Sequence, residues 1–104
     1  MKELASALKH PENKFNGPLN LSNNVQLTDL SGLYISEIFS GAGGITELNL
    51  SGNTLLESKT GQFIGEALMA NPSYSISRLT FKDVRLEETG FYRLLEAVNL
   101  NKNV

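Results

Sequence analysis

Three charged side chains fall within one short segment, and they are the groups best suited to hold a ligand. Arg78 precedes the apolar residues Leu79 and Phe81 of that segment, and Lys82 and Asp83 follow them. An arginine guanidinium can donate two parallel hydrogen bonds to a carboxylate, while lysine offers only a point charge. This mixture of positive and negative side chains favours binding to a protein partner over catalysis. The alternative is that these are solvated positions of little energetic weight, as most surface charges are.

The groups of a catalytic centre do not come together in the sequence. Glu87 and Glu88 are adjacent, so their side chains point apart instead of flanking a substrate. The serines and the single histidine, His10, show no order that would assemble a Ser-His-Asp triad. The glycine-rich stretch 41–44 lacks the lysine and hydroxyl residue that end a phosphate-binding loop. We therefore expect a protein that is not an enzyme and needs no cofactor.

Composition narrows the class of partner. The chain has 104 residues and a formal net charge of −2, which predicts no nucleic-acid partner. It contains no cysteine and one histidine, so we expect neither a disulfide nor a metal site. Nothing resembles a signal peptide or a membrane span, which predicts a cytoplasmic protein without direct membrane insertion.

A pattern of leucines and asparagine recurs along the chain. The segment from Ile45 to Asn53 reads I-x-x-L-x-L-x-x-N, with Leu48 and Leu50 on one side of a predicted strand. Its counterparts are Leu19, Leu21 and Asn24 one unit earlier, and Leu79 and Phe81 one unit later. The two intervals between units are nearly equal. Such periodicity is typical of a solenoid built from one strand and one helix per repeat.

Helices are expected after each strand. In the second unit residues 61–68 should be helical, with a core-facing stripe of Phe63, Ile64, Ala67 and Leu68, and Asn71-Pro72 should end the helix. In the third unit Leu94, Leu95, Ala97 and Val98 should lie on a helix, after a one-residue deletion between Leu86 and Leu94. We expect Tyr34 and Tyr92 to pack on the helical layer and Tyr74 to lie in a loop.

Repeats with this spacing resemble the ribonuclease-inhibitor-like class of leucine-rich repeats. The matching elements are Leu48, Leu50, Asn53, either Leu55 or Leu56, then Gly61 and the pair Ala67-Leu68. The resemblance implies an α/β fold, a leucine-rich-repeat solenoid (a horseshoe segment) with a short parallel sheet on the concave side and helices on the convex side. It also implies that Asn24 and Asn53 form a structural ladder between turns, which Val84 would interrupt in the third unit.

The domain organisation follows from the same count. We expect a single segment over residues 1–104, with 1–14 as the closing helix of a partial repeat and 15–44, 45–75 and 76–104 as repeats. The expected context is an excerpt of a longer array. A complete small protein capped by dimerisation is the alternative. The last repeat has no following layer, which predicts self-association through it.

Two functions of this class remain open. The segments 17–24 and 45–58 resemble successive repeats of the CARMIL family of actin capping-protein regulators, which implies a non-catalytic protein-interaction scaffold within a cytoskeletal or signalling protein. The alternative is a GTPase-activator-type module that stimulates a partner GTPase. In either case an extended concave face should bind the protein partner. The positions expected on that face are Asn20, Glu47, Asn49, Arg78, Thr80, Lys82 and Asp83.

Overall fold

The computed structural model describes residues 16–24, 26–40, 44–71, 74 and 76–100. Within them the chain alternates strands and helices in the order β1 (Gly17–Asn20), α2 (Asp29–Ile38), β2 (Ile45–Asn49), α3 (Ser58–Ala70), β3 (Arg78–Thr80) and α4 (Glu87–Leu100). The expectation of an α/β fold with a parallel sheet is confirmed. The expected closing helix over 1–14 lies outside the described residues.

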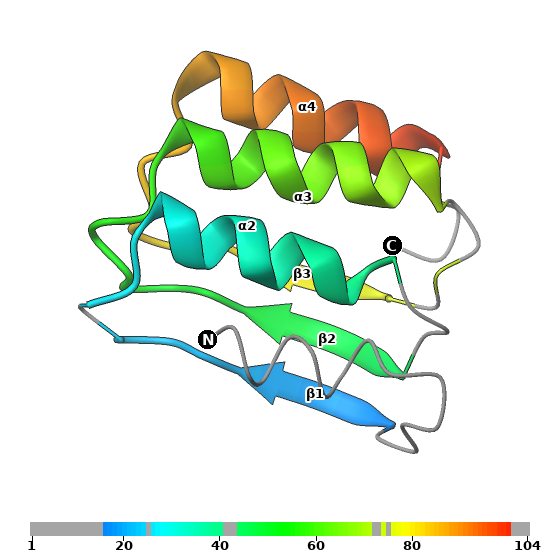
Figure 1. The fold of residues 1–104 in the computed structure, drawn as a ribbon, viewed down its shortest axis with the longest axis horizontal. Coiled ribbons are helices and arrows are strands. Elements are labelled where there is room, and N and C mark those ends of the chain that lie inside the picture. The colour runs from blue at the N-terminus through cyan, green and yellow to red at the C-terminus, as the bar shows by residue number, and fades with distance from the viewer. Residues whose placement is uncertain (1–15, 25, 41–43, 72–73, 75, 101–104) are drawn as a thin grey trace.

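The described elements form two layers. The strands pair in parallel in the order β1-β2-β3, and α2, α3 and α4 lie side by side over one face of the sheet (Figure 1). Among the described elements no helix covers the opposite face, which we call the open face. Because side chains alternate along a strand, one set of residues enters the core and the other set faces outward.

The repeated leucines of the three strands lie opposite one another in the sheet. Leu19 pairs with Leu48 and Leu48 pairs with Leu79, as the repeated sequence pattern predicts. Leu48 and Leu50 are buried between sheet and helices. They belong to a core that also contains Ile35, Ile38, Phe39, Ile45, Leu56, Ile64, Leu68, Tyr74, Ile76, Leu94 and Ala97. Burying this apolar surface is the main force that holds the two layers together.

The same turn follows each strand. Asn23, Gly52 and Asp83 occupy equivalent positions and have φ angles of 59°, 76° and 61°. Glycine adopts this left-handed region freely, and asparagine and aspartate are the side chains that tolerate it best. The three units therefore share local backbone geometry as well as a hydrophobic pattern.

The expected one-residue deletion in the third unit is wrong, since two residues are missing. The helices begin at Asp29, Ser58 and Glu87, at equal spacings along the chain. The paired strand leucines are not equally spaced, because Leu79 follows Leu48 at a longer interval than Leu48 follows Leu19. The shortening therefore lies in the loop between β3 and α4. Glu87 enters its helix with a φ of 54°, a conformation that a side chain of this size adopts at an energetic cost.

The predicted core stripe of α3 is also corrected. The helix starts earlier than expected, at Ser58, and ends directly before Asn71 as predicted. Phe63 and Ala67 are only partly buried. The buried face consists instead of Thr60, Gly61, Ile64, Gly65 and Leu68.

Close helix packing explains this change of face. A Cβ added to Gly61 would lie 2.9 Å from the Cα of Gly90, and one added to Gly65 would lie 2.7 Å from the carbonyl oxygen of Arg93. The small residues of α3 thus let α4 approach its backbone. A pattern of hydrophobic residues does not predict this contact, because it depends on glycines, which have no side chain.

Candidate functional site

A polar cavity of about 260 Å³ lies on the open face of the sheet. We call it the open-face cavity. Its lining residues come from all three strands: Pro18, Leu19, Asn20, Glu47, Leu48, Asn49, Arg78 and Thr80. Five of the seven positions expected from the sequence to bind a partner are therefore brought together by the sheet.

The cavity is organised in two rows that run across the strands. Pro18, Glu47 and Arg78 form one row, because β1 pairs with β2 and β2 with β3 at these residues. Asn20, Asn49 and Thr80 form the second row by the same pairing. Neighbouring strands lie about 4.8 Å apart, so adjacent side chains within a row are within reach of one ligand group.

The two asparagines of the second row are held by their own turns. Asn20 Oδ1 accepts hydrogen bonds from the backbone N–H of Ser22 at 2.9 Å and from its hydroxyl at 2.6 Å. Asn49 Oδ1 accepts from the backbone N–H of Ser51 at 3.0 Å. With the oxygen engaged, each amide presents its NH₂ group as a donor. Neither Nδ2 atom donates a hydrogen bond to any residue in the part of the chain that the structure describes.

Arg78 and Glu47 contact each other across the first row. Arg78 Nε lies 3.8 Å from Glu47 Oε1, and the two side chains are 70% and 44% exposed. An ion pair this long and this exposed contributes little to stability. The geometry of this ion pair shows which donors of Arg78 can bind a ligand. Glu47 contacts Nε, so the two terminal amino groups of the guanidinium make no hydrogen bond among the described residues.

Lys82 and Asp83 do not line the cavity. Both lie in the turn after β3, which ends at Thr80. The backbone of Lys82 is tied to the second unit, since its N–H donates to Ser51 Oγ at 3.0 Å and its carbonyl accepts from the N–H of Gly52 at 2.8 Å. The charged patch expected from the sequence is thus divided between a strand and a turn.

Asn53 is structural. It is fully buried, and its Nδ2 donates to the carbonyls of Leu50 at 2.7 Å and of Leu21 at 2.9 Å. Its Oδ1 accepts from the backbone N–H of Asn24 at 3.0 Å. The Asn24 amide donates in turn to the Leu21 carbonyl at 2.7 Å. One side chain therefore satisfies backbone groups of two successive turns. In the third unit Val84 has no amide to offer.

Two further links between units were missed by the sequence reading. Asp29 Oδ1 accepts from Thr60 Oγ1 and from the backbone N–H of Glu57, at the start of the helical layer. Asn71 Nδ2 donates to the Phe39 carbonyl at 3.1 Å, at its other end. The repeat pattern gives no sign of the first link, because the position equivalent to Asp29 in the second unit is Ser58.

A glycine contact between α3 and α4 did leave a signal. Gly32, Gly61 and Gly90 follow one another at equal spacings, one in each unit. Each comes close to a neighbouring helix or its N-terminus, and a Cβ at Gly90 would lie 2.7 Å from the carbonyl oxygen of Ser58. Only Gly61 was recognised from the sequence, as an element of the repeat pattern.

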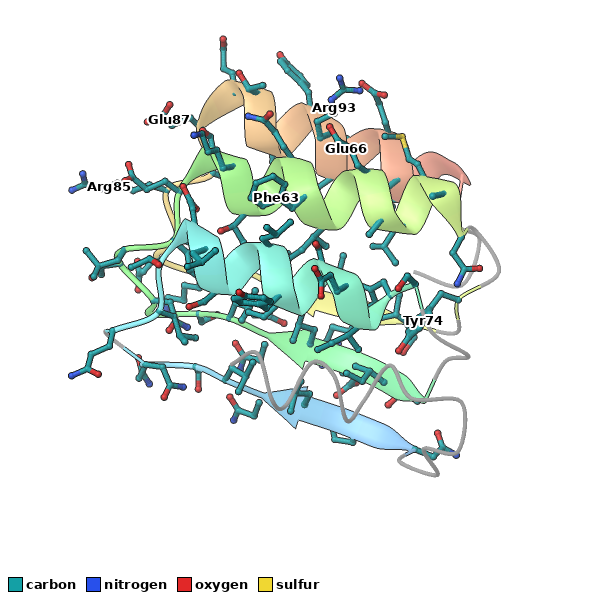
Figure 2. All side chains as sticks on the ribbon, viewed as in Figure 1. Phe63, Glu66, Tyr74, Arg85, Glu87 and Arg93 are labelled. Carbon is teal, nitrogen blue, oxygen red and sulfur yellow. The ribbon has the colours of Figure 1, made fainter. Side chains whose placement is uncertain are left out.

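The helical side offers no comparable constellation of polar groups among the described residues. Figure 2 shows Glu66 and Arg93 on α3 and α4, and Arg85 and Glu87 at the loop end of the third unit, all away from the sheet. Arg93 Nη1 lies 3.6 Å from Glu96 Oε2 on the same helix, where both side chains are largely exposed. These positions form a solvated charged layer.

The tyrosines differ in how far they follow the expectation. Tyr34 is partly buried against the core, as predicted, but Tyr92 is 57% exposed and does not pack on the helical layer. Tyr74 lies outside the helices and strands, as predicted (Figure 2). Its side chain is nevertheless buried, with the ring edge-on to Phe39 at a centroid distance of 5.1 Å. Burial raises the pKa of the Tyr74 phenol above its usual value, and the hydrogen bond from the Ile45 backbone N–H opposes this shift.

A second, apolar groove of about 550 Å³ lies between β3 and α4. It is lined by Leu79, Phe81, Val84, Leu86, Glu87, Phe91, Leu94, Leu95 and Val98. Phe91 and Leu95 are 51% and 40% exposed. This side of the molecule matches the surface that the sequence predicts to promote self-association.

The described residues hold no cluster of histidine, aspartate or glutamate able to bind a metal ion. Among the described helices none is long and apolar enough to cross a membrane. Compared with known protein families, curated proteins and solved structures, the chain matches none. The site must therefore be interpreted from its own geometry.

Proposed function

We propose that this chain is a segment of a leucine-rich-repeat solenoid, that its open face is the concave side, and that this face binds a protein partner without catalysing a reaction. The solenoid assignment is supported by three strand–turn–helix units with the same left-handed turn and an asparagine ladder. Units that stack in this way share one core and expose an extended sheet face.

The observation that carries the binding function is the open-face cavity. It gathers the amides of Asn20 and Asn49 with the side chains of Arg78 and Thr80, on rigid strands. Donors fixed in this way lose little conformational freedom on binding. Of the partners that this class of repeat serves, an actin-regulatory or signalling assembly in the cytoplasm agrees with the CARMIL resemblance, and the chain would act there as scaffold.

The test is capture from cytosolic lysate with the immobilised chain and two matched variants. The open-face variant combines Asn20→Ala, Asn49→Ala and Arg78→Glu. The control variant is Glu66→Ala, on the exposed surface of α3. We expect the open-face variant to lose the captured protein and the control to retain it, with both variants keeping the wild-type circular dichroism spectrum.

Two outcomes redirect or overturn the proposal. Equal capture by the wild-type chain and the open-face variant would assign binding to another surface. Capture of a GTPase, with faster GTP hydrolysis when the chain is added to the purified GTPase, would replace the scaffold with the GTPase-activator alternative.

A further inference from the structure

We propose that the open-face cavity recognises a short acidic segment of the partner, with a carboxylate on Arg78 and backbone carbonyls on the row of Asn20, Asn49 and Thr80, which we call the asparagine row. This inference rests on the function proposed above and specifies the chemistry of the bound segment. It starts from an imbalance between donors and acceptors in the cavity.

The cavity is rich in hydrogen-bond donors. Asn20 and Asn49 each direct an NH₂ group to the open face, because serine N–H groups occupy their oxygens. Thr80 adds a hydroxyl in the same row. The terminal amino groups of Arg78 are not used in its contact with Glu47. Glu47 is the one carboxylate among the lining residues, and it faces this guanidinium.

This set selects among possible ligands. Any peptide segment brings backbone carbonyls for the two amides, so the selection is made at Arg78. A basic segment would place its cations beside this guanidinium, with Glu47 as the one carboxylate to pair with. An apolar segment would cover the terminal amino groups of Arg78 without offering them an acceptor, which is unfavourable. A carboxylate matches the planar fork of Arg78, and carbonyl oxygens match the two amides and the hydroxyl.

The dimensions limit the length of the segment. Asn20, Asn49 and Thr80 lie on three successive strands, so their row spans about 10 Å at the usual spacing of strands. An extended chain rises about 3.3 Å per residue, so roughly three or four residues cross the row. Recognition of a longer segment would require neighbouring sheet surface.

Electrostatics give the inference a distinctive signature. The charges of Arg78 and Glu47 cancel, so the cavity has no net positive charge. It binds an anion only when the Arg78 guanidinium turns away from Glu47 toward the ligand. Glu47 competes with the ligand carboxylate for the same guanidinium and also repels it. Removing the charge of Glu47 should therefore strengthen binding, whereas removing the charge of Arg78 should weaken it.

The experiment is a titration of the full isotope-labelled chain with blocked tetraglutamate, followed by NMR. The informative signals are the side-chain NH₂ groups of Asn20 and Asn49 and the Nε–H of Arg78. Tetraglutamine tests the contribution of the carboxylates, tetralysine tests the sign of the charge, and tetrathymidylate tests phosphate as the source of the acceptors. We expect saturable shifts with tetraglutamate and binding roughly tenfold weaker with tetraglutamine.

Variants complete the test. Arg78→Gln should weaken tetraglutamate binding by about tenfold, and Glu47→Gln should strengthen it by about threefold. Glu66→Gln, on α3, should leave the affinity unchanged. Each variant changes an exposed or half-exposed surface residue, and its backbone spectrum verifies the fold.

The inference is overturned if tetraglutamate causes no shifts even with Glu47→Gln, if tetralysine binds equally well, or if tetrathymidylate binds more tightly. Loss of lysate capture by the open-face variant, together with any of these results, would leave the proposed function standing and remove only the acidic segment. Capture that is indifferent to the open face would remove the proposed function itself.

Discussion

Asp29, the first residue of α2, accepts a hydrogen bond of 2.6 Å from the hydroxyl of Thr60 in α3. The same oxygen accepts the backbone N–H of Glu57, the N-cap residue of α3, at 2.9 Å. The side chain of Glu57 makes no capping hydrogen bond itself. The cap of α3 is therefore supplied by the preceding unit, and a carboxylate in this place also suits the helix dipole.

Replacing Asp29 by alanine should destabilise the chain by about 1–3 kcal/mol, because the buried Thr60 hydroxyl and the N–H of Glu57 both lose their acceptor. Asp29→Asn keeps an acceptor oxygen and should lose less. Urea unfolding of both variants, with Thr60→Val in a double-mutant cycle, measures the link. An Asp29→Ala chain as stable as the wild type would show that the contact carries no net stability.

Leu50 should be far more sensitive to truncation than its neighbour Asn49. Leu50 is buried in the core, where Leu→Ala typically costs about 2–5 kcal/mol. Asn49 lies on the open face, where alanine should cost only about 1 kcal/mol, through the lost hydrogen bond from the Ser51 backbone N–H. Denaturant melts of Leu50→Ala and Asn49→Ala compare the two directly. Equal losses would be incompatible with the observed register.

The strand register could be predicted because it depends on a repeated apolar pattern. Leu19, Leu48 and Leu79 recur with the unit, so the pairing in the sheet follows from counting residues. The asparagine row of the open face follows from the same count. The sequence does not show that the side-chain oxygens of Asn20 and Asn49 accept hydrogen bonds from backbone N–H groups two residues later. This contact depends on the backbone conformation of the turn.

The helical layer was harder to predict, for a physical reason. Hydrophobic periodicity gives Phe63 a core position, yet the face of α3 that packs is set by how closely α4 can approach Gly61 and Gly65. Small residues carry no hydrophobic signal. The two-residue shortening before Glu87 could not be predicted from the sequence either, because the loop between β3 and α4 has no periodic pattern of hydrophobic residues.

Asn53→Ala should destabilise the chain by about 1–3 kcal/mol, since it leaves the N–H of Asn24 and the carbonyl of Leu50 without their partner. The Leu21 carbonyl keeps its hydrogen bond from the Asn24 amide. Val84→Ala, the matched change in the third unit, should lose only packing. Thermal or urea unfolding gives the two free energies.

Hydrogen exchange tests the same difference locally. The turn after β3 lacks an asparagine and is fastened through Ser51 and Gly52 at its Lys82 end. We expect its amides to exchange faster than those of the turn after β2. Equal protection of the two turns would mean that the contacts of Lys82 replace the ladder fully.

The last prediction concerns association of the chain with itself. β3 is an edge strand of the described sheet, and the apolar groove beside it exposes Phe91 and Leu95. An edge with unpaired backbone groups next to an apolar surface favours pairing with a second copy. Sedimentation of the isolated chain should therefore show a molar mass that rises with protein concentration.

Phe91→Lys or Leu95→Lys should abolish this rise, because a charge in the groove cannot be buried without a partner. Tyr92→Lys is the matched control, since Tyr92 is exposed on the same helix but does not line the groove. A wild-type chain that stays monomeric up to millimolar concentration, or a Tyr92→Lys variant that dissociates as readily as Phe91→Lys, would show that the groove is not the contact surface.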